Sequence, residues 1–163
     1  MIRRIATAAA LLSLFAALPT RAGTRPWTLD DALRVRTVTD PQVSPDASHV
    51  AYVVSELKED GGEYQTDVWT IPTAGGEARR LTASPVADES PRWSPAGHWI
   101  AFLSDRPRPD AKGEDPEARR QLWTIRPDGG EAVPLTRAPG GVATFAWSHD
   151  GKFVVFLSHD PKS

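Results

Sequence analysis

The chain has 163 residues, of which 40% are hydrophobic and 25% are charged, close to the averages of globular proteins. It contains no cysteine, which excludes disulfides, thiolate metal sites and cysteine nucleophiles. The formal net charge of −2 gives no basic surplus of the kind that nucleic-acid-binding proteins carry.

The first 22 residues have the pattern of a secretory signal peptide. Arg3 and Arg4 precede an apolar run over residues 5–18, and small residues at Thr20 and Ala22 follow it. This run is shorter than the ~20 residues that a membrane-spanning helix needs. We therefore predict cleavage after Ala22 and a periplasmic or secreted protein.

Removal of residues 1–22 makes the chain more acidic. The rest of the chain contains 16 Lys and Arg against 21 Asp and Glu. An acidic surface disfavours binding to nucleic acid, and after signal cleavage it also disfavours binding to anionic membranes. We expect neither as a partner.

Residues 23–40 form a lead-in segment that precedes the first repeat. Thr28 followed by Asp31 is typical of a capping box, in which each side chain accepts a hydrogen bond from the backbone of the other residue. The sequence therefore predicts a short helix from Thr28 through about Arg34.

From residue 41 onward a block of about fifty residues recurs. PQVSPDASHVAYVVSE (41–56) returns as PRWSPAGHWIAFLSD (91–105) and FAWSHDGKFVVFLSHD (145–160), and DVWTIPTAGGEARRLT (67–82) returns as QLWTIRPDGGEAVPLT (121–136). A fixed period is typical of a repeat fold, in which each unit buries its apolar face against a neighbour. Five pairs of residues lie 54 positions apart: Trp69 and Trp123, Gly75 and Gly129, Thr82 and Thr136, Trp93 and Trp147, and Phe102 and Phe156.

The repeated strings predict short strands. The runs 50–55, 99–104 and 153–158 are rich in β-branched and aromatic residues on both alternating faces, which indicates strands covered on both sides. The best-defined unit has four: 91–94, 99–104, 121–126 and 132–136. Four-stranded antiparallel units of this length are propeller blades. We predict an all-β partial β-propeller over residues 41–163, with two blades and the start of a third.

Turn residues separate the predicted strands. Ser-Pro-Asp-Gly-like turns precede the second strand of each unit, and Ala47, Ala96 and His149 each replace one residue of that pattern. We expect the first turn to change type or loosen, because Ala47 stands where glycine accepts a positive φ. The pairs Gly75-Gly76 and Gly129-Gly130 predict hairpins.

Two insertions lengthen the repeat, and both follow the second strand of a unit. They span residues 56–66 and 105–120, so we expect them on the same face of the disc. The second mixes both charge signs with prolines, which favours a solvated loop, with a contact to a missing domain or a substrate entrance as the other possibility. Large aromatic residues at repeated positions indicate core between blades: Trp69, Trp93, Trp99, Trp123 and Trp147.

These motifs resemble the N-terminal β-propeller of the prolyl oligopeptidase family of serine peptidases. SPDASHVAYVVS with DVWTIPTAGGEARRLT, and WSPAGHWIAFLSD with QLWTIRPDGGEAVPLT, are similar to the acylaminoacyl peptidase and dipeptidyl aminopeptidase branch. The opening WTLDDALRVRTVTDPQVSPD (27–46) is the most discriminating piece. The resemblance implies a downstream α/β-hydrolase domain with a catalytic serine, a propeller that restricts access to it, and peptide substrates.

The chain itself offers no catalytic residues. No serine has glycine two places before and two places after it, so the nucleophile elbow is missing. We interpret His49, His98, His149 and His159 as surface residues of turns and strand ends, and name no catalytic, cofactor-binding or metal-binding residue. We expect no cofactor and a truncation before the catalytic domain. Bare blade faces should make this chain marginally stable or prone to aggregation.

Two functions remain open at this stage. The first is the non-catalytic, substrate-gating propeller of a secreted or periplasmic serine peptidase. The second is a TolB-like periplasmic propeller that acts as a protein-binding scaffold without an attached enzyme.

Overall fold

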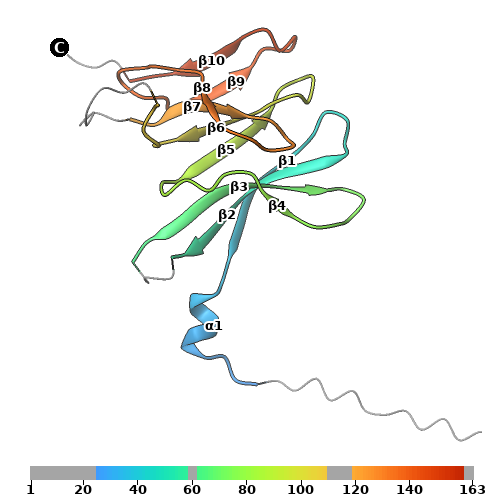
Figure 1. Cartoon of the computed structure of the whole chain (residues 1–163), viewed down its shortest axis with the longest axis vertical. Helices are drawn as coiled ribbons and strands as arrows, with labels where there is room; N and C mark the ends of the chain where they lie inside the picture. Colours follow the sequence, from blue (N-terminus) through green and yellow to red (C-terminus); the bar gives the residue numbers. More distant parts are fainter. Residues whose placement is uncertain (1–24, 59–61, 110–118, 160–163) are drawn as a thin grey trace, which may run out of the picture.

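The structure, a computed structural model, describes residues 25–58, 62–109 and 119–159. Its strands form three antiparallel sheets (Figure 1). Blade 1 contains β1 (Thr37–Val43), β2 (His49–Leu57), β3 (Tyr64–Pro72) and β4 (Arg79–Arg80). Blade 2 contains β5 (Asp88–Trp93), β6 (Ile100–Ser104), β7 (Gln121–Ile125) and β8 (Val133–Pro134). A third sheet, the hairpin of blade 3, contains β9 (Thr144–Trp147) and β10 (Val154–Leu157).

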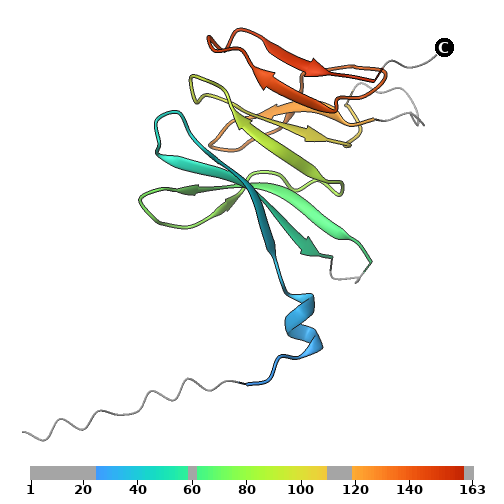
Figure 2. The same cartoon turned by 180° about the vertical axis from the view of Figure 1, so that it is seen from behind.

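The three sheets lie one above another as successive layers in both views (Figures 1 and 2). Within each blade the strands are hydrogen-bonded in chain order, so every unit folds as an antiparallel meander. This arrangement confirms the predicted all-β partial propeller with two blades and the start of a third. The predicted signal peptide, residues 1–22, lies outside the described residues.

The lead-in segment contains the predicted helix, α1 (Leu29–Leu33), capped by Thr28. The amide of Thr28 donates to Asp31 Oδ2 at 2.9 Å, and the amide of Asp31 donates to Thr28 Oγ1 at 3.3 Å, which completes the capping box. Strand β1 begins at Thr37, so the end of the lead-in segment already belongs to blade 1. Within the described ranges, no helix has the length and apolar character needed to cross a membrane.

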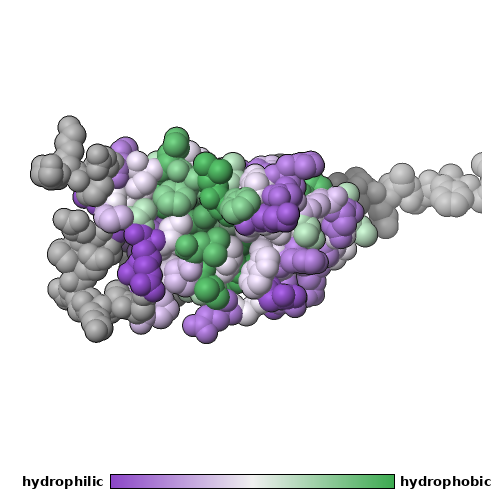
Figure 3. Space-filling model, turned by 90° about the horizontal axis from the view of Figure 1, so that it is seen from above, coloured by the Kyte–Doolittle hydropathy of each residue, from purple (hydrophilic) through white to green (hydrophobic). Residues whose placement is uncertain are grey.

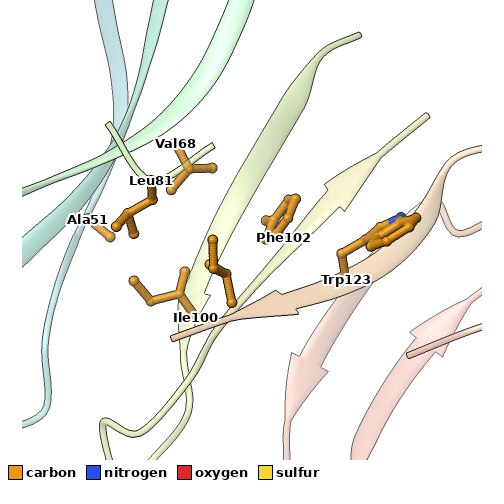
Figure 4. Close-up of a cluster of buried hydrophobic side chains, with 7 residues drawn as sticks. Ala51, Val68, Leu81, Ile100, Phe102 and Trp123 are labelled. Atoms are coloured by element: carbon orange, nitrogen blue, oxygen red, sulfur yellow. The ribbon is translucent and has the colours of Figure 1, made fainter. Parts of the chain in front are cut away.

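Apolar side chains from adjacent blades meet in the core. Figure 4 shows Ala51, Val68 and Leu81 of blade 1 beside the side chains of blade 2, and this cluster is buried. Its members from blade 2 are Ile100, Phe102, Trp123 and Ile125. Both buried apolar clusters lie between sheets. Because transfer of apolar area from water contributes roughly 25 cal/mol per Å², this burial stabilises the stacking of the blades.

Alternation along each strand decides which blade a residue contacts. On β6, Ile100 and Phe102 face blade 1, whereas Ala101 and Leu103 pack with the cluster that includes Phe145 and Val154 of blade 3. All residues of β6 and β7 are buried. The prediction of strands covered on both faces is thus confirmed in blade 2.

The turn after the first strand has the same geometry in every unit. The amide of its fourth residue donates to the carbonyl of its serine at 2.8 Å in Ala47, 2.8 Å in Gly97 and 2.9 Å in Gly151. Ala47 adopts φ 57°, in the same region as Gly97 at 72° and Gly151 at 68°. The expectation that Ala47 changes or loosens its turn was wrong, because the surrounding hydrogen bonds hold alanine in a left-handed conformation.

The fourth strand is shorter than predicted. The run 132–136 contains only β8 (Val133–Pro134), because the ladder continues through a side chain. The amide of Leu122 donates to Thr136 Oγ1 at 2.9 Å, and the amide of Val68 donates to Thr82 Oγ1 at 3.0 Å in blade 1. The threonine that ends each unit therefore replaces a backbone acceptor.

The predicted first insertion is also shorter, since β2 continues to Leu57 and β3 begins at Tyr64. The second connection runs from the end of β6 at Ser104 to Gln121, and residues 110–118 of it lie outside the described residues. The strand ends that lead into the two connections point to the same side of the molecule in Figures 1 and 2, as expected for this topology.

Burial of the repeated tryptophans depends on the neighbouring blade. Trp123 is 2% exposed, because it faces blade 1. Trp69, Trp93 and Trp147 are only half-buried, and Trp99 is 38% exposed, with the Arg126 guanidinium 5.5 Å from its ring centroid. The assignment of all five to the core was therefore wrong for Trp99, and fully correct only for Trp123.

The outer face of blade 3 is an exposed apolar surface. Phe153, Val155 and Leu157 share one face of the hairpin and are 65% to 68% exposed. Figure 3, which looks onto this end of the molecule, shows hydrophobic side chains gathered in a band. The equivalent residue of blade 2, Leu103, is 3% exposed because blade 3 covers it.

Replacement of Ala47 by glycine should increase the free energy of unfolding by about 1 kcal/mol, because glycine adopts a positive φ without the steric cost that alanine has there. The matched control, Gly97→Ala, should decrease it by a similar amount, since the added Cβ would make only an ordinary 3.7 Å contact with Pro45. Urea unfolding followed by circular dichroism measures both. Equal stability of the two variants would contradict the strain argument.

The pair Leu103 and Leu157 tests the exposed flank, because the same residue type occupies equivalent positions in blades 2 and 3. Leu157→Thr should reduce concentration-dependent self-association of residues 23–163 with little loss of stability. Leu103→Thr should cost about 2 to 4 kcal/mol, since it places a hydroxyl in the core. Light scattering coupled to size exclusion and urea unfolding provide the measurements. A monomeric wild-type chain with a cooperative thermal transition would count against the expected aggregation.

Candidate ligand-facing wall formed by the first strands

The first strands of the three units, β1, β5 and β9, come together on one side of the sheets. Each lies at the edge of its sheet, and in blades 2 and 3 a tryptophan joins this strand to the first strand of the preceding blade. Trp93 Nε1 donates to the carbonyl of Gln42 at 2.9 Å, and Trp147 Nε1 donates to the carbonyl of Arg92 at 3.2 Å. These inner strands therefore form one continuous wall.

The indole hydrogen bonds explain the position of tryptophan in the repeat. Trp93 and Trp147 are the last residues of β5 and β9. From there each indole N–H reaches the unpaired edge of the first strand in the preceding blade. In blade 1 the same position holds Val43, which has no donor and is 61% exposed. Tryptophan hydrogen bonds therefore connect β1, β5 and β9 to one another, whereas β1 itself has no such donor.

A bulge interrupts the inner strands of blades 1 and 2. The register of β1 shifts between Thr39 and Gln42, and that of β5 shifts between Glu89 and Arg92. Within these shifts Asp40 has φ 48° and Ser90 has φ 57°. A proline follows each of them and supplies no amide hydrogen to the ladder, which is a usual setting for a bulge. Strand β9 lacks this proline and pairs in regular register.

The first bulge presents a charged pair on the wall. Asp40 Oδ2 accepts a hydrogen bond from Arg92 Nη1 at 2.8 Å, and Asp40 Oδ1 accepts one from Gln42 Nε2 at 2.8 Å. Arg92 Nη1 also donates to the carbonyl of Pro91 at 2.7 Å. The side chains of Asp40 and Arg92 are 29% and 38% exposed, so solvent and ligands can reach both.

A hollow of about 330 Å³ lies beside this pair. It combines aromatic surface with one guanidinium and one carboxamide, and its lining residues come from all three units: Gln42, Val43, Pro45, Arg92, Trp93, Phe145, Ala146 and Trp147. Apolar walls with a few polar groups are typical of sites that bind organic ligands. A peptide offers matching chemistry, because its amides can hydrogen-bond to Arg92 and Gln42 while its side chains contact the aromatic rings.

The four histidines form no catalytic arrangement. His98, His149 and His159 are exposed, and His49 begins β2 with its Nδ1 2.8 Å from Ser48 Oγ. Asp46 accepts a hydrogen bond from the Ser48 hydroxyl at 2.8 Å, so the carboxylate contacts the serine, whereas a triad needs it on the imidazole. In the part of the chain that the structure describes, no cluster of His, Asp or Glu could hold a metal ion.

Asp46 has a structural role in its turn. Hydrogen bonds from the hydroxyl of Ser44, and then from the amide and hydroxyl of Ser48, lower the pKa of Asp46 to about 2. The equivalent Asp150 accepts hydrogen bonds from Ser148 and Lys152, which lower its pKa in the same way. Ala96 cannot form these bonds in blade 2. The aspartates thus stabilise turns and are not free for acid–base chemistry.

Sequence reasoning named no residue of this wall as a ligand contact. Asp40 precedes the first repeated string, and Arg92 takes the place of Gln42 in the second, so neither residue recurs in the repeat. A signal was present, since Asp40-Pro41 and Ser90-Pro91 lie 50 positions apart, within equivalent strands. Proline inside a predicted strand indicates an edge or a bulge.

Two curated proteins are similar to most of this chain. The chain is 36% identical over 128 residues to uncharacterized peptidase YuxL of Bacillus subtilis, which covers 78% of this chain and 18% of YuxL. It is 31% identical over 116 residues to dipeptidyl-peptidase 5 of Porphyromonas endodontalis, 71% of this chain and 15% of that protein. The chain therefore spans less than a fifth of the length of these two relatives.

Solved structures show the same fold. The acylaminoacyl peptidase of Pyrococcus horikoshii superposes with a TM-score of 0.58 at 18% identity, over 78% of this chain and 18% of that one. The chain matches the N-terminal propeller of the prolyl oligopeptidase family. These matches confirm the resemblance inferred from the sequence, although no family model matches the chain.

TolB proteins are also similar to part of this chain. TolB of Anaeromyxobacter dehalogenans is 42% identical over 50 residues, 31% of this chain and 10% of that protein. The structure of TolB from Acinetobacter baumannii superposes with a TM-score of 0.51 at 18% identity, over 78% of this chain and 39% of that one. This sequence match has the length of about one repeat, whereas the peptidase matches span more than two repeats' length.

Loss of the indole hydrogen bond in Trp93→Phe should decrease the free energy of unfolding by about 1 kcal/mol, because the carbonyl of Gln42 loses its donor. Trp99→Phe is the matched control, since Trp99 is 38% exposed and should change stability by less than about 0.5 kcal/mol. Urea unfolding followed by circular dichroism compares them. Equal losses in the two variants would show that the indole N–H contributes nothing.

Proposed function

We propose that this chain is the non-catalytic, substrate-gating propeller portion of a secreted or periplasmic serine peptidase similar to acylaminoacyl and dipeptidyl aminopeptidases. In the whole protein a serine of a C-terminal α/β-hydrolase domain attacks the peptide carbonyl. The propeller contributes the route by which peptides reach that serine. The pattern of residues 1–22 supports export.

The observation that carries this proposal is the extent of the peptidase match. The alignment with YuxL covers 128 residues, which exceeds two repeat lengths and reaches beyond any single blade motif. YuxL and dipeptidyl-peptidase 5 are both named as peptidases and are both more than five times longer than the matched region. Such lengths leave room for further blades and a catalytic domain.

The inner wall gives the gating role a physical basis. A peptide that passes along β1, β5 and β9 meets the Asp40–Arg92 pair and the aromatic hollow. The carboxylate of Asp40 can accept hydrogen bonds from peptide amides or a terminal amine, and Arg92 can donate to carbonyls. Asp40 and Arg92 already pair with each other, so a passing peptide has to compete with that ion pair. The wall therefore favours weak, transient contacts over tight binding.

A TolB-like scaffold is the second candidate, and the 42% identity over one blade length favours it. In that case the same wall would bind a protein segment without cleavage. The coding sequence that follows the codon for Ser163 separates the two candidates. Further blades followed by Gly-x-Ser-x-Gly support the peptidase, and closing blades followed by a stop codon support the scaffold.

Arg92→Ala in the full-length protein should change the ratio of kcat/KM for long peptides to that for dipeptide anilides by about three- to tenfold, because long peptides use more of the wall. Arg126→Ala is the matched control, since Arg126 contacts Trp99 and Asp128, neither of which lines the hollow. An unchanged ratio would remove the gating role. Absence of any hydrolysis by the wild-type protein would instead favour the scaffold.

A further inference from the structure

The guanidinium of Arg92 uses only part of its hydrogen-bonding capacity within the protein. Its Nη1 donates to Asp40 Oδ2 at 2.8 Å and to the carbonyl of Pro91 at 2.7 Å. Among the described residues, no acceptor takes a hydrogen bond from its Nε or Nη2. These two nitrogens carry a parallel pair of N–H donors, which matches the two oxygens of a carboxylate. The Arg92 side chain is 38% exposed, so a ligand can reach it.

Asp40 positions this guanidinium without occupying the parallel donors. Its Oδ2 accepts from Arg92 Nη1, and its Oδ1 accepts from Gln42 Nε2 at 2.8 Å. Arg92 cannot turn freely, because rotation of its guanidinium would break the hydrogen bonds to Asp40 and to the carbonyl of Pro91. A donor group that is already held in place loses less conformational entropy when a ligand binds.

Fixed aromatic rings adjoin Arg92 in the hollow of about 330 Å³. The indole N–H groups of Trp93 and Trp147 donate to backbone carbonyls at 2.9 Å and 3.2 Å, which fixes both rings. Phe145 on β9 adds a third ring, and all three are half-buried, so part of their apolar area faces the hollow. This volume is at the lower end of those of ligand sites, which suits one amino-acid residue.

The charge of the hollow favours one end of a peptide. Arg92 is the only ionised side chain among the residues that line it, since Asp40 contacts Arg92 from outside the lining. A terminal amine would meet a like charge there, whereas a carboxylate would meet an opposite one. The negative charge of Asp40 weakens this attraction, so the affinity should be low.

The repeat does not require an arginine at this position. The equivalent residues of units 1 and 3 are Gln42 and Ala146, and both also line the hollow. These residues occupy the same place in β1 and β9 without a cation, so the strands form without one. The positive charge of Arg92 is therefore a property of the hollow and is unnecessary for the blade fold.

We propose that the hollow binds the C-terminal residue of a peptide and prefers an aromatic or large apolar side chain there. The terminal carboxylate accepts hydrogen bonds from Nε and Nη2 of Arg92, away from the Nη1 that Asp40 holds. The side chain of the ligand packs against Trp93, Phe145 and Trp147. This inference rests on the proposed function only in that peptides reach the inner wall, and it requires no cleavage.

Binding of tripeptides to the full-length protein tests the proposal. Prior treatment with a sulfonyl fluoride blocks a catalytic serine where one is present, so binding is measured without cleavage. Gly-Gly-Phe with a free carboxylate should bind about three- to tenfold more tightly than Gly-Gly-Phe amide, because only the acid forms charge-assisted hydrogen bonds. Gly-Gly-Gly with a free carboxylate should also bind more weakly than Gly-Gly-Phe. Ligand-observed NMR titrations give the Kd values.

Arg92→Gln should remove the difference between acid and amide, whereas Arg126→Gln should retain it. Arg126 is the matched control, because it also pairs with an aspartate, Asp128, and lies over a tryptophan ring, Trp99, outside the hollow. In the wild-type protein, added salt should reduce the difference, a readout that needs no variant. Equal binding of acid and amide, or an equal loss in Arg126→Gln, would overturn the C-terminal site.

This outcome is separate from that of the gating test. An acid–amide difference together with an unchanged kcat/KM ratio in Arg92→Ala would support the C-terminal site and contradict gating. A changed kcat/KM ratio without an acid–amide difference would support gating and contradict the C-terminal site.

Discussion

The structure depends on the contact between successive sheets. A blade has apolar side chains on both faces of its strands, and the turns of its own meander cover neither face. Blade 2 is buried because blades 1 and 3 supply the two covers, and the contrast between Leu103 and Leu157 shows what one missing cover means. Every other feature, including the inner wall and its tryptophan hydrogen bonds, is positioned by this stacking.

Sequence periodicity was sufficient to predict the class of fold, the order of strands and the helix capped by Thr28, because these depend on local patterns. It was insufficient where a neighbour decides the outcome. The burial of Trp123 and the exposure of Trp99 follow from which blade lies opposite, and a repeat motif contains no such information. Ala47 keeps its turn because the hydrogen bonds around it outweigh its own preference.

The candidate site was the part least accessible from sequence. Asp40 and Arg92 are 52 positions apart, and they meet where the register of both β1 and β5 is interrupted by a bulge. Blade motifs alone do not separate a peptidase from a scaffold, since both use the same turns and hairpins. The Asp40–Arg92 pair on the inner wall is not part of these turns and hairpins, so a difference in ligand should depend on such groups.

The joint between blades 1 and 2, where Asp67 pairs with Arg80 and Asp88 pairs with Arg106, has a consequence for how such chains can evolve. Asp67 and Asp88 belong to adjacent units, and each buried carboxylate pairs with an arginine of its own unit. A tandem duplication of blade 2 would set Asp88 against Gln121, and deletion of blade 1 would leave Arg106 and Asp88 facing water. Blades that look interchangeable in an alignment therefore differ in the groups that they bury at each joint.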